Sequence, residues 1–142
     1  MDEIDKEILV CLQENGRLSM TELGKKVKLS NPAINERVKK LEERDIILGY
    51  RAVINPAAVN KVITAYILYN TTRCKPFVSF CKEHPDVIEC NRLAGQYDYL
   101  IKVVTKSVKT LEDFIDRSME YGKPSSLINL SSPVSNKVIR NF

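Results

Sequence analysis

The chain has 142 residues, of which 44% are hydrophobic and 28% are charged, and its formal net charge is +4. This balance is typical of a globular protein with one ordinary domain or two small ones, and it argues against long disordered tails and fibrous repeats. The longest apolar stretch without a charge, residues 62–72, is much shorter than the roughly 20 residues of a membrane-spanning helix. The acidic start Asp2-Glu3 lacks the basic opening of a signal peptide, so we expect a cytoplasmic protein.

Three apolar ladders with helical spacing occupy the first part of the chain. They consist of Ile4, Ile8 and Leu12, of Met20, Leu23 and Val27, and of Ile34, Val38 and Leu41. Ser19 and Glu22 form a capping box for the second helix, while Ser30 is expected to cap the third, with Pro32 in its first turn. Only residues 28–30 join these two helices. So short a connection predicts the steep crossing of a helix-turn-helix.

The spacing of apolar residues changes after Arg44, because residues 49–55 have the pattern of a short extended segment that stops at Pro56. We place a domain boundary there. Beyond it the sequence predicts a strand at 64–71, a helix that ends at His84-Pro85, strands at 87–94 and 97–104, a helix from Ser107 to Gly122, and a strand at 127–133. This order is that of a ferredoxin-like domain, with two helices on one face of an antiparallel sheet.

Two details of the second domain are also predicted. Gly95-Gln96 is expected to form a two-residue type II′ turn between the two middle strands. In the helix that Ser107 caps, the inward-facing residues are expected to be Val108, Leu111, Phe114 and Ile115. Both domains are small, so each buries little apolar surface alone and we expect the protein to form oligomers.

Basic residues are concentrated in the helix-turn-helix. Residues 1–14 contain five acidic residues and one basic residue, whereas residues 17–40 contain seven basic and two acidic residues, a net charge of +5. Charge concentrated in this way is typical of a module that neutralises DNA phosphates. The alternative is a solvated helical face without a partner.

The third helix presents the expected DNA-reading residues. Asn31, Asn35 and Lys39 share its exposed edge, and an asparagine amide can pair with adenine while Glu36 could accept from cytosine. Arg37 and Lys40 flank the apolar stripe and are expected to hold phosphates. The predicted DNA-binding residues are therefore Ser30, Asn31, Pro32, Asn35, Glu36, Arg37, Lys39 and Lys40.

Two segments resemble one known family. The run from Ile4 to Tyr50 is similar to the winged helix-turn-helix of the leucine-responsive regulatory protein and asparagine regulator (Lrp/AsnC) family. The run VIECNRLAGQYDYLIKV, from Val87 to Val103, is similar to the signature of the family's effector domain. The resemblance implies an α+β transcription regulator with a winged helix-turn-helix over residues 1–55 and a ferredoxin-like effector and oligomerisation domain over residues 56–142. It also implies dimers that assemble into octamers or similar discs, with a free amino acid bound between dimers.

The chain departs from the family pattern at several positions. Gly24 and Lys28 stand where the family often has Ala and Gly, and a lysine forced into a left-handed conformation costs about 1 kcal/mol. Gln96 stands where Asp or Asn is common, and Lys123-Pro124 precedes the last strand. Which amino acid is bound is left open.

The expected effector site comprises Gly95, Gln96, Tyr97, Asp98 and Tyr99. An amino acid presents an ammonium and a carboxylate, which would suit the Asp98 carboxylate and the exposed backbone N–H groups of Gly95 and Gln96. The alternative reading is that the tyrosines, together with Ile101 and Val103, form one packed face of an ordinary strand.

Other chemistry is weakly supported. Cys81 and His84 have the Cys-x-x-His spacing of a zinc site, but their spacing also fits a core stripe, so no metal or cofactor is expected. There is no nucleophile motif, Walker loop or second histidine, which argues against an enzyme. The four cysteines (Cys11, Cys74, Cys81 and Cys90) are expected to be buried, reduced thiols. The competing functions are an architectural DNA-binding protein of low specificity and a small ferredoxin-like enzyme.

Overall fold

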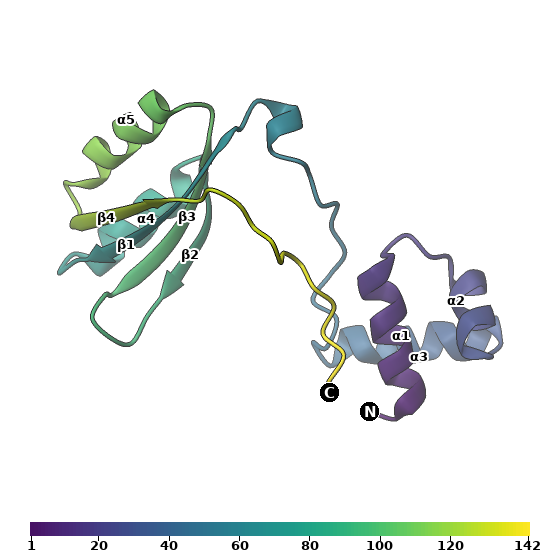
Figure 1. Ribbon diagram of the computed structural model, residues 1–142. Coiled ribbons are helices and arrows are strands. Elements are labelled where there is room, and N and C mark those ends of the chain that lie inside the picture. The colour runs from purple at the N-terminus through teal and green to yellow at the C-terminus, as the bar shows by residue number, and fades with distance from the viewer. The chain divides into compact units, whose positions relative to one another are not determined.

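The computed structural model describes residues 1–142, which divide into two compact units (Figure 1). The helical unit comprises residues 1–53 together with residues 134–142, and the sheet unit comprises residues 54–133. The last nine residues thus pack with the first part of the chain. None of the helices is both long and apolar enough to span a membrane.

The helical unit contains three helices around one small core. They are α1 (Glu3–Glu14), α2 (Met20–Val27) and α3 (Asn31–Glu43). The predicted ladders supply most of the core, which consists of Ile8, Leu9, Leu12, Leu23, Val27, Ile34, Val38 and Leu41. Each ladder occupies one helical face, and the three faces share this core; α3 crosses α1 at a steep angle, as Figure 1 shows. The predicted helix-turn-helix is confirmed.

The helix ends explain why the turn is so short. Ser19 and Glu22 form the predicted capping box, in which the Ser19 hydroxyl accepts from the Glu22 N–H at 3.2 Å. Lys28 ends α2 in the left-handed conformation, with φ 57°. Ser30 occupies the N-cap position of α3, as predicted. Its side chain forms no capping hydrogen bond, so the predicted capping interaction is wrong. Pro32 lies in the first turn as predicted.

The segment after α3 forms no strand within this chain. Residues 49–55 are irregular, with Gly49 at φ 146°, and a short 3₁₀ helix, η1 (Ala57–Val59), follows. The extended residues of the expected wing therefore find no sheet partner in the chain.

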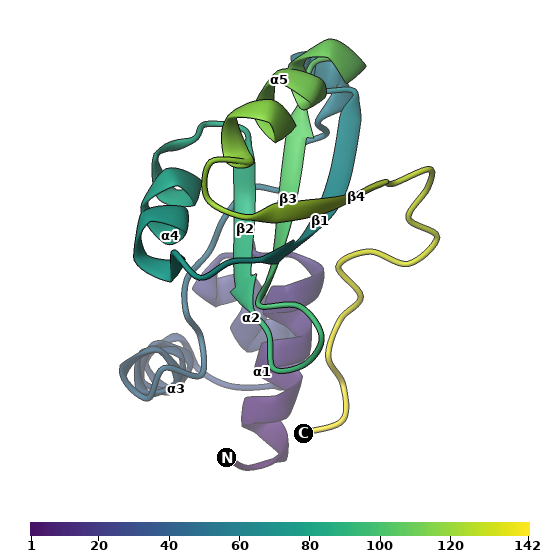
Figure 2. The same cartoon turned by 90° about the vertical axis from the view of Figure 1, so that its left-hand side faces the viewer.

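The sheet unit is a ferredoxin-like domain, as predicted. Its elements are β1 (Ile63–Asn70), α4 (Cys74–Glu83), β2 (Val87–Arg92), β3 (Tyr99–Thr105), α5 (Val108–Ser118) and β4 (Lys123–Ile128). The antiparallel sheet has the order β2-β3-β1-β4, and both helices lie on one of its faces (Figure 2). Alternate residues of β1 and β3, such as Ile67 and Ile101, pair across the strands and pack under Phe77 and Phe114.

Three details differ from the prediction. β4 begins at Lys123 rather than 127, and it pairs with β1 through Leu127 opposite Tyr66. Val108 is 61% exposed because it begins the first turn of α5 at the helix surface, whereas Leu111 and Phe114 are buried. The two-residue turn at Gly95-Gln96 is absent, since pairing stops at Arg92 opposite Tyr99 and leaves a six-residue loop, residues 93–98.

Candidate DNA-binding and effector sites

The unpaired basic side chains of the helix-turn-helix lie on α2 and its flanks. Arg17, Lys25, Lys26 and Lys28 are exposed and form no ion pair. On α3, by contrast, Lys39 lies 3.6 Å from Glu43, and Lys40 lies 3.1 Å from Glu36. Both of these pairs are exposed, so water and salt screen them strongly and they can open toward a phosphate. Within the helix-turn-helix, the unpaired positive charge is therefore centred on α2 and the turn.

Arg37 is held inside the helical unit. Its guanidinium donates to Asp2 at 2.8 Å and to Asp5 at 2.7 Å. Asp2 and Asp5 also cap α1 reciprocally, so one arginine of α3 clamps the start of α1. The Asp5 N–H and the Arg37 guanidinium lower the pKa of Asp2, and the two carboxylates raise that of Arg37. This placement favours a structural role over the predicted phosphate contact.

The exposed edge of α3 carries two partly engaged asparagines. The Asn31 side-chain amide donates to the Thr21 hydroxyl at 2.9 Å, and that of Asn35 donates to the Asn31 carbonyl at 2.8 Å. Each keeps its side-chain oxygen and a second N–H for a partner. Ser30, Pro32, Glu36, Lys39 and Lys40 are exposed near them on the same helix or at its start. The structure thus groups the predicted reading residues on one helix.

Sequence reasoning missed part of this surface. Thr21 was not singled out, yet it orients Asn31 from the first turn of α2. Lys25, Lys26 and Lys28 were counted as charge but not as individual contacts. Their signal in the sequence was partial, since Lys28 has no acidic residue three or four positions away. Lys25 and Lys26 have Glu22 at those positions, but its carboxylate bonds to Ser19 in the capping box.

The expected effector loop is anchored through Asp98. The Asp98 carboxylate accepts from the Thr71 N–H at 2.8 Å, the Asp98 N–H donates to the Tyr69 carbonyl at 2.8 Å, and the Asp98 carbonyl accepts from Leu93 N–H at 2.8 Å. Only Oδ2 of the carboxylate is used, so Oδ1 remains free. Asp98 is therefore a structural anchor that keeps one free acceptor.

The rest of the loop is open. Gly95 and Gln96 are exposed, and their N–H groups donate to no group of the chain. A Cβ added at Gly95 would meet nothing within 4 Å. Tyr97 is half-buried, whereas Tyr99 is 5% exposed and packs on Phe77 with ring centroids 5.1 Å apart. Tyr99 therefore belongs to the packed face of its strand, as the alternative reading of the sequence predicts. The other four expected residues, 95–98, lie in the loop.

Three chain segments meet beside this loop. Thr71 follows β1 and donates through its hydroxyl to the Tyr121 carbonyl just before β4. A Cβ at Gly122 would lie only 2.5 Å from the Asn70 carbonyl oxygen, so a larger residue there would force the backbones apart. Thr71 and Gly122 were not identified from the sequence, because their importance depends on contacts between distant segments.

The thiols and the single histidine do not form a metal site. Cys81 faces the core, and burial raises the pKa of its thiol to about 12. His84 instead packs edge-on against Phe114, with ring centroids 4.7 Å apart. No three His, Cys, Asp or Glu side chains are grouped to hold an ion. All four cysteines are free, but only Cys81 is buried and Cys90 is exposed, so the prediction of four buried thiols is wrong.

Comparison with known proteins agrees with both halves of this architecture. Residues 1–42 match the AsnC-type helix-turn-helix domain, and residues 65–139 match the Lrp/AsnC ligand binding domain. An uncharacterized HTH-type transcriptional regulator of Bacillus subtilis, YezC, is 54% identical over 132 residues, which cover 93% of this chain and 95% of the relative. A proline dehydrogenase transcriptional activator from Rhizobium radiobacter is 37% identical over 77% of this chain and 73% of its own length.

Solved structures show the same arrangement over nearly the full length. LrpC of Bacillus subtilis superposes with a TM-score of 0.91 at 30% identity, covering 96% of this chain and 99% of that one. A transcriptional regulator from Neisseria meningitidis in complex with L-methionine gives a TM-score of 0.92 at 28% identity, covering 98% and 96%. With its helix-turn-helix, its ferredoxin-like domain and these relatives, the chain belongs to the Lrp/AsnC family of transcription regulators.

Proposed function

We propose that α2 and the following turn hold DNA phosphates while α3 reads bases in the major groove. The observation that carries this proposal is the separation of roles on the surface: unpaired cations on α2 and its flanks, and exposed asparagines on α3. Phosphate contacts give affinity without sequence information, and side-chain amides in the major groove give discrimination. The reading surface also includes Ser30, Pro32, Glu36, Lys39 and Lys40. Arg37 supports this surface by holding α3 against the start of α1.

The open face of the sheet supports assembly of several copies. Tyr66 and Leu68 of β1 point away from the helices, beside Leu100 of β3, and Leu127 of β4 is 55% exposed next to Tyr66. Apolar side chains on an uncovered sheet face are typical of a surface that another copy covers. We infer a dimer formed through this face, which assembles further into an octamer or a similar ring. A dimer would present two α3 helices to half-sites roughly 34 Å apart, or a multiple of that.

The loop of residues 93–98 is proposed to bind a free amino acid. Two unengaged N–H groups, at Gly95 and Gln96, could hold a carboxylate, and the free oxygen of Asp98 could accept from an ammonium. The Neisseria relative is a complex with L-methionine, which supports an amino acid as the ligand class. An effector bound between dimers changes DNA binding only if it favours one assembly or geometry, with couplings of about 1 to 3 kcal/mol. We assign no catalytic role and no cofactor, and we place the protein with the DNA in the cytoplasm.

Capture of genomic fragments by the purified protein tests the division of roles. Near 0.15 M salt, the wild type should enrich fragments that contain imperfect palindromes. The double variant Asn31→Ala, Asn35→Ala should lose enrichment while retaining DNA, whereas Lys25→Ala, Lys26→Ala should weaken the retention of all sequences. The double variant Lys75→Ala, Lys82→Ala on α4 also removes two exposed positive charges, so it serves as the charge-matched control and should behave as the wild type. Retention without enrichment by the wild type would indicate an architectural protein, and the reverse pattern of the two helix-turn-helix variants would overturn the assignment.

A further inference from the structure

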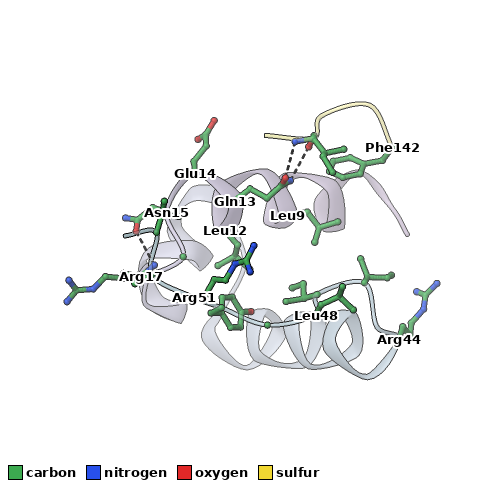
Figure 3. Close-up of a pocket in the computed structure, with 18 of the residues that line it drawn as sticks. Leu9, Leu12, Gln13, Glu14, Asn15, Arg17, Arg44, Leu48, Arg51 and Phe142 are labelled. Atoms are coloured by element: carbon green, nitrogen blue, oxygen red, sulfur yellow. Dashed lines mark hydrogen bonds between the residues drawn. The ribbon is translucent and has the colours of Figure 1, made fainter. Parts of the chain in front are cut away.

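The C-terminal segment Lys137–Phe142 is bound to α1 of the helical unit (Figure 3). The side-chain amide of Gln13 makes two hydrogen bonds to the backbone of one residue. It donates to the Ile139 carbonyl at 3.0 Å and accepts from the Ile139 N–H at 2.9 Å. In addition, Arg140 forms an ion pair with Glu14, the next residue of α1. These contacts join residues 126 positions apart in the sequence.

The segment lies at the edge of an apolar groove of the same unit. The groove has a volume of about 1110 Å³ and is formed by α1, the residues after α3 and the C-terminal segment. Its apolar lining includes Leu9, Leu12, Ile47, Leu48, Ile139 and Phe142. Figure 3 shows Leu9 and Leu12 of α1 facing Leu48 across the opening, with Phe142 at its rim. Phe142 is 44% exposed, so more than half of its surface is already covered.

The chemistry of Gln13 suits recognition of an extended peptide. One primary amide offers a donor and an acceptor side by side, which matches the N–H and C=O that one extended residue presents on one edge. Two such bonds fix both the position and the direction of the segment, whereas apolar contact alone would allow it to slide. The ion pair of Arg140 adds a charge match one residue further along.

We propose that Gln13 and Glu14 of α1, at the edge of this groove, form the docking site of the chain's own C-terminal segment, and that docking gives the helical unit a second attachment to the sheet unit. The first attachment is the linker that leads from the helical unit into β1. The second begins where β4 ends at Ile128 and reaches α1 through the docked residues. A change at the end of β4 would then reach the DNA-binding helices by two covalent routes. This inference holds whichever DNA or ligand the protein recognises.

Hydrogen–deuterium exchange of the full-length protein tests the docking. In Gln13→Ala, the amide of Ile139 loses its acceptor and the segment loses both bonds, so the C-terminal peptide should exchange about tenfold faster. Gln13→Glu keeps an acceptor for the Ile139 N–H but cannot donate to its carbonyl, and it should give an intermediate rate. Glu7→Ala on the same helix, where the side chain has no hydrogen bond or ion pair, should leave the rate unchanged. Equal exchange in Gln13→Ala and the wild type would overturn the proposal.

The same variant shows whether the segment bound to α1 belongs to the same chain or to another copy. Gln13 is exposed, and circular dichroism should confirm that Gln13→Ala keeps the helical content of the wild type. If each segment docks on its own chain, light scattering should give the same stoichiometry for Gln13→Ala and the wild type. A lower stoichiometry for Gln13→Ala would mean that the segment bridges two copies, and it would overturn the assignment to the chain's own terminus.

Discussion

Arg37 shows how packing redirects a basic residue of α3. Its side chain is 29% exposed and meets Asp2 and Asp5, which cap α1. An arginine engaged by two carboxylates is a poor ligand for a phosphate, since the phosphate would have to displace both. We therefore interpret Arg37 as a positioning residue that holds α3 against the start of α1.

Arg37→Ala should lower the melting temperature of the protein by several degrees, because it removes both hydrogen bonds to the carboxylates that cap α1. Lys39→Ala, which removes an exposed charge two residues away, should leave the melting temperature nearly unchanged. Differential scanning calorimetry at pH 7 compares the two. An unchanged melting temperature in Arg37→Ala, combined with a general loss of DNA affinity, would restore the phosphate-binding interpretation.

His84 is the single histidine of the chain, and its environment favours the neutral ring. Burial lowers its pKa, and the nearby positive charges of Arg117 and Lys61 act in the same direction, while Asp86 opposes them. Its Nδ1 accepts from the Asp86 N–H at 3.3 Å, and a protonated Nδ1 could not accept. The His84 ring therefore contributes stability that is present above its usual pKa near 6.5 and is lost as the pH falls through the lower pKa of the folded protein.

An NMR titration of the single histidine should give a midpoint below 6.5, and the unfolding free energy should decrease as the pH falls from 7 toward 5. Arg117→Gln removes one of the positive charges that lower the pKa of His84, so it should move the midpoint upward. A midpoint at or above 6.5 in the wild type would show that the ring is not desolvated as the structure indicates.

At the scale of elements, the connection between α2 and α3 combines a strained residue with a tight contact. Lys28 adopts the left-handed conformation, and its N–H and that of Leu29 both donate to the Gly24 carbonyl. A Cβ on Gly24 would lie 2.7 Å from the Leu29 carbonyl oxygen, so this position excludes a larger residue in the present geometry. Glycine thus occupies the position where a Cβ would clash with the Leu29 carbonyl, whereas lysine occupies the position with the left-handed conformation.

Lys28→Gly should raise the unfolding free energy by about 1 kcal/mol, because glycine adopts positive φ without strain. The same change removes one unpaired cation, so DNA binding should weaken and the slope of log K against log salt should decrease by about 1. Lys28→Ala removes the charge but keeps a Cβ, and it should weaken DNA binding without the gain in stability. Chemical denaturation and salt titrations measure both effects. A gain in stability without any change in the salt slope would remove Lys28 from the DNA surface.

Local sequence patterns predicted most of the architecture. The three ladders and the order of six elements in the sheet unit follow from apolar spacing of 3.6 or 2 residues, and the capping box follows from Ser19 and Glu22 three residues apart. The strand at 123–128 was placed four residues late, because Lys123-Pro124 hid its start, and an edge strand tolerates both residues.

Contacts between distant segments could not be predicted in this way. The clamp of Arg37 on Asp2, the anchoring of Asp98 by Thr71 and the binding of Ile139 to Gln13 each depend on how helices and strands pack, and no local spacing encodes them. As a result, the sequence could propose residues for both candidate sites but not the contacts that hold them. The six-residue loop that replaces the expected turn also depends on such contacts, since the Asp98 N–H bonds to Tyr69 of β1 and a single hydrogen bond, from the Leu93 N–H to the Asp98 carbonyl, closes the loop.

We propose that a free amino acid bound at the loop of residues 93–98 controls DNA binding. A labelled fragment retained in the capture experiment can be titrated with protein, by fluorescence anisotropy, in the presence of each natural amino acid. Asp98→Asn keeps an acceptor for the Thr71 N–H but loses the charge for an ammonium, and Glu89→Gln on β2 is the matched control. We predict that at least one amino acid changes the Kd by about 5-fold to 150-fold in the wild type and in Glu89→Gln, and has no effect in Asp98→Asn. A Kd that no amino acid changes in the wild type, or one that changes equally in Asp98→Asn, would contradict the account.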